Sequence, residues 1–175
     1  MKLPAKYQWL NKEPAPPILV QARHLFGIVE VKGDGSNPLI MSWAKETGLT
    51  SMYSDDSVPW CGLFMAACAK RAGEPVPPLA LRALNWANYG APARFAMLGD
   101  VLTFKRDGGG HVGLYVGDDK DAYHVLGGNQ SDQVCITRIA KTRLYAIRRS
   151  LYKERPPNVR VIKLEASGEL SHNEA

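Results

Sequence analysis

The pattern of apolar residues changes near Gly99, and this change constrains the fold more than any other feature of the sequence. Upstream, apolar residues recur at helical spacing, as between residues 18 and 26. Downstream, short runs rich in Val, Ile, Tyr and Thr alternate with clusters of Gly, Asp and Asn, which is typical of consecutive antiparallel strands. The five runs span residues 99–106, 111–117, 121–128, 133–139 and 142–149. Helices followed by strands predict an α+β protein, with N-terminal helices packed on a small five-stranded antiparallel sheet.

Turn-forming and capping residues divide the helical half of the chain. Ser36 or Asn37 is a suitable N-cap for a helix that begins at Pro38 and ends at Gly48. The other expected helices span residues 18–26, 60–73 and 79–90. We therefore expect three parts, which are an N-terminal lead (1–17), one domain (18–150) and a loosely ordered polar tail (151–175).

The composition is that of a globular protein of 175 residues with a formal net charge of +5. The basic residues are scattered instead of forming a stripe with aromatic residues, so the sequence does not predict nucleic-acid binding. It contains neither the apolar segment of a signal peptide nor a run of about 20 apolar residues. We therefore expect a protein that is cytoplasmic at synthesis, is not stably inserted in a membrane, and is a monomer. The positive charge favours approach to polyanions such as a bacterial cell wall.

The chain has three cysteines, Cys61, Cys68 and Cys135. An odd number without a pairing pattern argues against a disulfide framework, so all three are expected to be thiols. No Cys-x-x-Cys or His-x-x-x-His spacing is present, and we expect neither a metal nor another cofactor. Cys68 and Cys135 are interpreted as buried structural thiols, since free cysteine is among the most buried residue types.

Cys61 is the candidate nucleophile. It follows Val-Pro-Trp at the start of an expected helix, where unpaired backbone N–H groups and the helix dipole favour an anion and lower the pKa of a thiol. Pro59 and Trp60 define how the chain enters that helix. Trp60 itself is expected either in a substrate groove or in the core, and we weigh the two equally.

His111 is the candidate base. A catalytic thiol needs one, and the chain offers four histidines. His24 lies in the first amphipathic helix and His172 in the tail, so neither has supporting context. His111 opens the strand "HVGLYVG" after a glycine-rich loop that lets other groups approach closely.

The third member of a triad would orient the His111 ring. A hairpin in which paired residue numbers sum to 238 places His111 opposite Gly127, with Asn129 as a diagonal neighbour on the same face. A slip by one residue presents His124 instead. Asn129 is therefore the expected orienting residue and His124 the reserve. The oxyanion is expected on the backbone N–H of Cys61, with Trp60 or Gln130 as a second donor.

These motifs together resemble a known family. The segments "VPWCGLF", "GDVLTFKRDGGGHVGLYVG" and "VLGGNQ" are similar, in this order, to the papain-like peptidoglycan hydrolases of the NlpC/P60 and CHAP superfamily. The resemblance covers roughly residues 20–148. It implies a papain-like fold with the nucleophile at Cys61, the base at His111 and the orienting residue at Asn129. NlpC/P60 proteins commonly have a second histidine at the third position, so this chain departs from that pattern.

The resemblance implies a cysteine peptidase or amidase that hydrolyses amide bonds in the peptide part of bacterial peptidoglycan. Such a protein would be a phage endolysin or a bacterial effector, delivered to the wall by a holin or a secretion system. Two alternatives remain. One is a transglutaminase-like acyltransferase that uses the same triad. The other is a non-catalytic wall-binding or phage structural module, which ranks last because both Cys61 and His111 are present.

Overall fold

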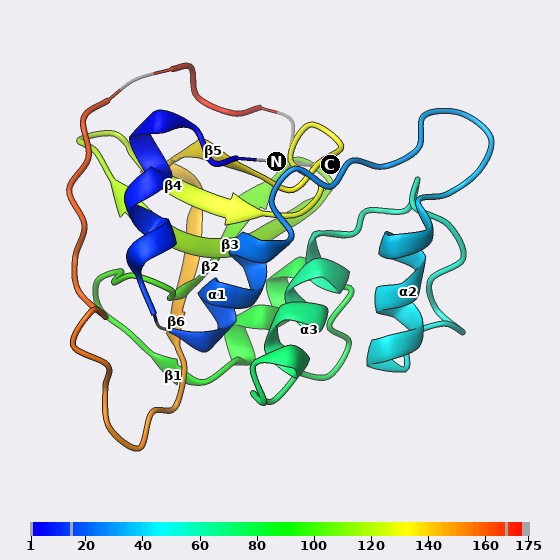
Figure 1. The fold of residues 1–175 in the computed structure, drawn as a ribbon, viewed down its shortest axis with the longest axis horizontal. Coiled ribbons are helices and arrows are strands. Elements are labelled where there is room, and N and C mark those ends of the chain that lie inside the picture. The colour runs from blue at the N-terminus through cyan, green and yellow to red at the C-terminus, as the bar shows by residue number, and fades with distance from the viewer. Residues whose placement is uncertain (1, 15, 167, 173–175) are drawn as a thin grey trace.

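The structure is a computed structural model that describes residues 2–14, 16–166 and 168–172. It contains one antiparallel sheet with the strand order β1-β6-β2-β3-β4-β5 and helices packed on it (Figure 1). The strands are β1 (Ala91–Pro92), β2 (Val101–Arg106), β3 (Gly109–Asp118), β4 (Ala122–Gly127), β5 (Cys135–Ala140) and β6 (Leu144–Arg149). The α+β class is confirmed. Five strands were expected and the described residues form six, because the two residues of β1 are too few to form a recognisable sequence pattern.

The helical half contains α1 (Pro17–His24), α2 (Pro38–Thr47) and α3 (Cys61–Arg71), together with the 3-10 turns η1 (Ala5–Lys12) and η2 (Ala83–Asn88). A further 3-10 turn, η3 (Lys141–Arg143), lies in the strand half, between β5 and β6. The expected caps of α2 are confirmed. The Asn37 side chain accepts a hydrogen bond of 2.9 Å from the Leu39 backbone N–H, and Gly48 ends the helix with a φ of 77°. Over residues 79–90, only the 3-10 turn η2 forms.

Helix α3 is the central element of the core. Its first nine residues are buried, and it packs against α1, α2, β3 and β4. The rings of Trp43 and Phe64 lie 6.0 Å apart, so an aromatic contact joins α2 to α3. A helix that is apolar on all sides is expected in such a position. Among the residues that the structure describes, no helix combines the length and apolar character needed to cross a bilayer.

The N-terminal lead is part of the folded domain. Tyr7 and Leu10 of η1 are buried in the same core cluster as α3. The Tyr7 hydroxyl also lies 2.6 Å from Nδ1 of His124 on β4. Residues 2–14 therefore close one side of the molecule.

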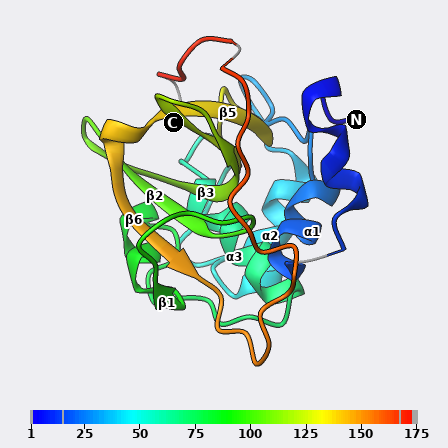
Figure 2. The same cartoon turned by 90° about the vertical axis from the view of Figure 1, so that its left-hand side faces the viewer.

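In the C-terminal segment, residues 151–166 and 168–172, several residues bond to the sheet, so the expectation of a loosely ordered tail is wrong for these residues. Figure 2 shows it in orange and red, running beside the strands. The Asp118 backbone N–H donates to the Ile162 carbonyl at 2.9 Å, and the Leu164 N–H donates back to Asp118 at 3.0 Å. Tyr115 adds a hydroxyl bond of 3.0 Å to the Ile162 carbonyl. Ion pairs of Lys163 with Asp118 and of Arg160 with Glu13 also hold this segment. These partners lie far away in the sequence, so the polar composition of the segment does not reveal them.

The β3–β4 hairpin has a different register from the one expected. Leu114 lies opposite Leu126, so paired numbers sum to 240 and not 238, and a bulge follows Tyr115. The turn itself explains the shift. The Asp119 carboxylate accepts hydrogen bonds of 2.9 and 3.0 Å from the backbone N–H groups of residues 121 and 122, which places the turn after residue 118.

Candidate active site

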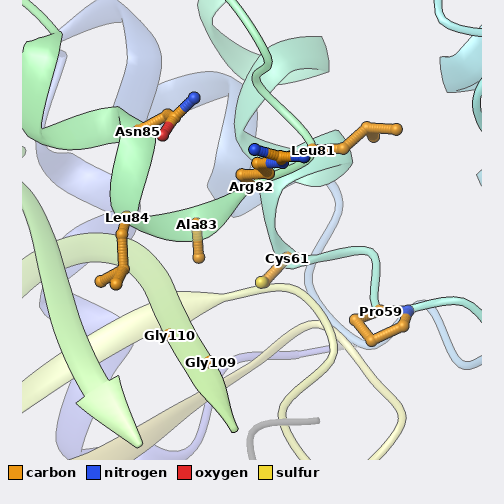
Figure 3. Close-up of a pocket in the computed structure, with 9 residues that line it drawn as sticks. All are labelled: Pro59, Cys61, Leu81, Arg82, Ala83, Leu84, Asn85, Gly109 and Gly110. Carbon is orange, nitrogen blue, oxygen red and sulfur yellow. The ribbon is translucent and has the colours of Figure 1, made fainter.

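A cleft of about 400 Å³ opens beside the first turn of α3 (Figure 3). Nine residues line it: Pro59, Cys61, Leu81, Arg82, Ala83, Leu84, Asn85, Gly109 and Gly110. Cys61 is the first residue of α3, and its sulfur points toward the side of the cleft formed by β3. The structure therefore places the candidate nucleophile at a helix N-terminus and on a cavity wall.

The Cys61 thiol is buried except at the cleft, with 3% of the residue exposed. Burial raises the pKa of the Cys61 thiol above its ordinary value. The backbone N–H of Val112, those of Gly62 and Cys61, and the positive charge of Arg106 oppose this rise. Because Val112 directly follows His111 on β3, its interaction with the sulfur brings the nucleophile against the strand that carries the candidate base.

Gly62 explains how the helix can begin at this position. A Cβ atom on Gly62 would lie 2.2 Å from the Ala80 carbonyl oxygen and 2.7 Å from that of Leu81. The backbone leading into η2 therefore packs directly on the first turn of α3. Only glycine permits this approach, which forms one wall of the cleft.

His111 lies near the start of β3, opposite Phe104 of β2, and is fully buried. Its Nε2 atom is 3.0 Å from Oε1 of Gln130. The expected diagonal contact with Asn129 is thus replaced by a bond to the next residue in the chain. The β3–β4 pairs end at Leu114 and Leu126, so His111 lies beyond this ladder and contacts Gln130 in the loop that follows β4.

The other bonds of Gln130 determine which nitrogen of His111 carries a proton. The Gln130 amide nitrogen donates to the Val125 carbonyl at 3.2 Å and to the Cys135 carbonyl at 2.6 Å. The amide oxygen must therefore face His111, and an oxygen can only accept. Nε2 of His111 consequently donates, so a neutral ring has its lone pair on Nδ1. Gln130 acts as an orienting group, and its amide N–H groups are already engaged and do not serve an oxyanion.

Two consecutive glycines make room for this arrangement. A Cβ on Gly127 would lie 2.8 Å from Oε1 of Gln130 and 3.2 Å from Nε2 of His111. A Cβ on Gly128 would lie 2.6 Å from Cβ of Phe64 and 2.7 Å from the Trp60 ring. The "GGNQ" segment therefore passes between α3 and β3 only because these two positions lack side chains.

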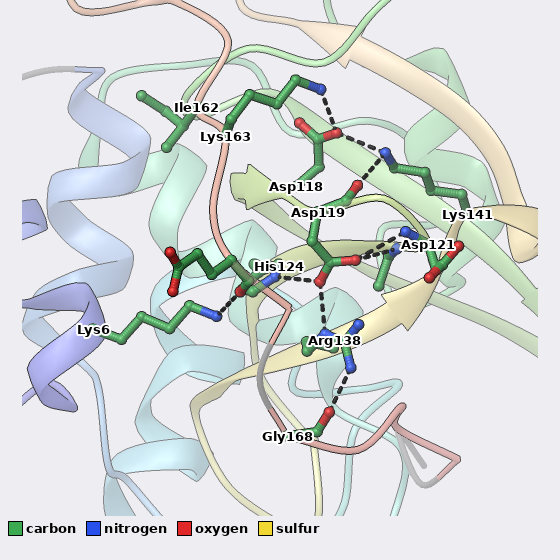
Figure 4. A network of polar contacts seen from close by, with 12 residues as sticks. Lys6, Asp118, Asp119, Asp121, His124, Arg138, Lys141, Ile162, Lys163 and Gly168 are labelled. Atoms are coloured by element: carbon green, nitrogen blue, oxygen red, sulfur yellow. Dashed lines mark hydrogen bonds and ion pairs between the residues drawn. The ribbon is translucent and has the colours of Figure 1, made fainter.

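The two residues expected in the third role lie elsewhere. Asn129 is buried with a left-handed φ of 56°, and its Oδ1 atom has no hydrogen-bond partner among the described residues. His124 is also buried, but its Nε2 lies 2.9 Å from Oδ2 of Asp119. Figure 4 shows this carboxylate between His124 and Arg138, which is 2.7 Å away. His124 thus belongs to a separate polar network together with Tyr7 of η1.

Trp60 has a packing role. The side chain is fully buried, and its Nε1 donates to Glu30 at 2.9 Å. The ring lies 6.0 Å from that of Trp43. Of the two expectations for Trp60, the core position is the one observed, and the indole N–H is not directed at the cleft.

The remaining cysteines differ from each other. Cys68 is fully buried, as expected, and burial raises the pKa of its thiol well above the ordinary value. Cys135 was expected to be buried, but it is partly exposed at the start of β5. Its sulfur donates to the Gln130 carbonyl at 3.3 Å, and partial burial raises the pKa of Cys135 to about 11. A strand-edge position explains the exposure, since β5 is the last strand of the sheet.

The chain matches no family model, and neither a curated protein nor a solved structure shows significant similarity to it. The chemistry of the site must therefore be inferred from its geometry. A thiol at a helix N-terminus, a histidine with a defined tautomer, a group that orients this histidine and an open cleft are the components of nucleophilic acyl transfer.

Proposed function

We propose that this chain is a papain-like cysteine hydrolase that cleaves amide bonds. The observation that carries the proposal is the bond of 3.0 Å between Nε2 of His111 and Oε1 of Gln130, on a strand whose next residue, Val112, interacts with the Cys61 sulfur through its backbone N–H. Because Nε2 donates to Gln130, the lone pair of the neutral ring lies on Nδ1, and this nitrogen can act as a base.

The proposed reaction proceeds through a thioester. The Cys61 sulfur attacks the carbonyl carbon of the scissile amide, and His111 takes the thiol proton and transfers it to the leaving amine. Water then attacks the thioester and gives a proton to His111, which returns it to the departing sulfur. The carboxylic acid is released and the thiol is restored. The backbone N–H of Cys61, at the helix N-terminus, stabilises the oxyanion.

The proposed substrate is the peptide part of bacterial peptidoglycan. The order of the Cys, His and "GGNQ" segments, similar to that of NlpC/P60 and CHAP hydrolases, supports this choice. The net charge of +5 favours approach to an anionic wall. A phage endolysin or a bacterial effector, brought to the wall by a holin or a secretion system, is the biological role that fits such an activity.

Mass spectrometry of purified muropeptides after incubation with the protein tests the proposal. We expect new fragments from an amide cleavage with the wild type and with Cys68→Ser, and none with Cys61→Ser, since a hydroxyl is a far weaker nucleophile at neutral pH. Circular dichroism of both variants serves as the folding control. Muropeptide cleavage by folded Cys61→Ser would overturn the mechanism. A muropeptide that gains an added amine would instead identify an acyltransferase.

A further inference from the structure

Arg82 is the one charged residue among the nine that line the cleft in the described part of the chain. Pro59, Leu81, Ala83 and Leu84 supply apolar side chains, and Figure 3 shows Arg82 on the η2 side of the cavity that also holds Cys61. No carboxylate is present among these nine residues. The lining is therefore mostly apolar, and Arg82 is the one charge that it carries, in the same cleft as the candidate nucleophile.

The Arg82 guanidinium has no internal function that the structure reveals. Within the described residues it forms no hydrogen bond or ion pair, and the residue is exposed. Other arginines differ in this respect. Arg71 binds Glu46 and Arg149 binds Asp100, each at 2.7 Å. Arg82 is consequently available to a ligand, since no internal carboxylate competes for it.

The backbone that carries Arg82 is firmly positioned relative to Cys61. The Arg82 N–H donates to the Leu79 carbonyl and its own carbonyl accepts from Asn85, both at 2.9 Å. The Trp86 indole N–H adds a bond of 2.9 Å to the Ala80 carbonyl, which lies directly against Gly62. A cation on a rigid segment binds its partner at a lower entropic cost than one on a mobile loop.

We infer that Arg82 is a specificity-determining residue, and that the cleft takes an acidic peptide whose carboxylate pairs with the Arg82 guanidinium next to the scissile amide. Arginine suits this role because its planar fork matches a carboxylate in a bidentate geometry. The apolar part of the cleft suits an apolar side chain, and that of alanine is one. This inference rests on the proposed function and deepens it, since the stem peptides of peptidoglycan contain alanine next to an acidic glutamyl residue.

Binding is measured first, in a Cys61→Ala background that excludes turnover. The probes are the tripeptide L-alanyl-γ-D-glutamyl-L-lysine and its counterpart with the glutamyl α-carboxylate replaced by a carboxamide, each titrated by NMR. We expect the acidic peptide to bind roughly 10- to 100-fold more tightly, the range for a hydrogen bond to a charged group. Arg82→Gln should remove this difference. Arg94→Gln removes the same charge from an exposed arginine near a different cavity and should preserve it.

Turnover separates this inference from the proposed function. With Cys61 intact, the ratio of kcat/KM between acidic and carboxamide muropeptides should fall toward one in Arg82→Gln and be partly restored in Arg82→Lys. Cleavage with a ratio that Arg82→Gln leaves unchanged would overturn the role of Arg82 while leaving the hydrolase intact. An acidic peptide that binds through Arg82, in a protein that cleaves no muropeptide, would support the role of Arg82 and refute the proposed activity. Equal binding of both tripeptides, or of neither, would overturn the inference.

Discussion

Replacing Gln130 with methionine isolates the group that orients His111. Methionine has nearly the volume of glutamine, so the change removes polar atoms without creating a large cavity. Four contacts are lost: 3.0 Å to His111, 3.2 Å to the Val125 carbonyl, 2.6 Å to the Cys135 carbonyl and a weak one of 3.8 Å to the Cys135 sulfur. The first of these contacts concerns catalysis and the others concern stability, so the two effects can be measured separately.

The expected magnitudes follow from these bonds. His111 becomes an imidazolium when it takes the thiol proton, and a hydrogen bond to a charged group contributes about 1.5–3 kcal/mol. At about 1.4 kcal/mol for each factor of ten, kcat should fall roughly 10- to 100-fold with little change in KM. The buried Val125 carbonyl loses its side-chain donor at about 1–3 kcal/mol and the part-buried Cys135 carbonyl at less, so the free energy of unfolding should fall by roughly 2–4 kcal/mol.

The assay measures kcat on a muropeptide substrate, together with urea unfolding so that rates refer to folded protein. Gln130→Glu tests positioning directly, because it keeps an acceptor for His111. It should retain more activity than Gln130→Met, with the acidic limb of the kcat/KM profile moved to higher pH, since a carboxylate stabilises the imidazolium. Asn129→Gly is the matched control, as glycine accepts the left-handed backbone there. If Asn129→Gly lost more activity than Gln130→Met, the orienting role assigned to Gln130 would be refuted.

Three further predictions concern neighbouring positions. Gly127→Ala places a methyl group 2.8 Å from Oε1 of Gln130. It should lower kcat and also lower the free energy of unfolding by roughly 1–3 kcal/mol. Wild-type turnover in this variant would contradict the packing argument. Burial lowers the pKa of His124 from its ordinary 6.5, so below that pH the unfolded chain binds a proton that the folded protein does not. Urea unfolding should therefore show that the free energy of unfolding falls from pH 7 to pH 5. The slope should be smaller in His124→Gln. Burial raises the pKa of both the Cys61 and the Cys135 thiols, so a preference between them depends on a base that takes the proton. With His111 in that role, iodoacetamide at neutral pH followed by peptide mapping should modify Cys61 before Cys135, and the reverse order would contradict the role of His111.

Much of the fold could be predicted because local patterns agree with the tertiary structure. The cap at Asn37, the left-handed Gly48 and the five strand-like runs are local signals, and each corresponds to an observed element. Strand β1 could not be predicted, since two residues are too few to show the alternation of apolar and polar side chains that marks a strand. The ordered C-terminal segment was missed because tertiary contacts, such as the bonds between Tyr115 and Ile162, hold it in place.

The candidate site was predicted in part. The placement of Cys61 at a helix N-terminus follows from its context, and His111 was expected on the strand where it lies. The orienting residue lies in the loop after β4, beyond the last β3–β4 pair, where Asn129 has a left-handed φ of 56°. The backbone path of such a loop has no pattern of apolar residues that would predict it. The consecutive glycines at 127 and 128 were the available signal for Gln130, because they show where two segments approach too closely for a side chain.

The C-terminal segment also affects how the sheet meets other molecules. One margin of the sheet is β1, only two residues long and containing Pro92. The other margin is β5, where Leu170 forms a bridge to Arg138 and the Ser171 N–H donates to the Arg138 carbonyl at 2.8 Å. A short strand and a covered strand both prevent an open ladder from recruiting another chain. A chain shortened at Ser150 would uncover the β5 margin, and its tendency to self-associate should then rise with concentration.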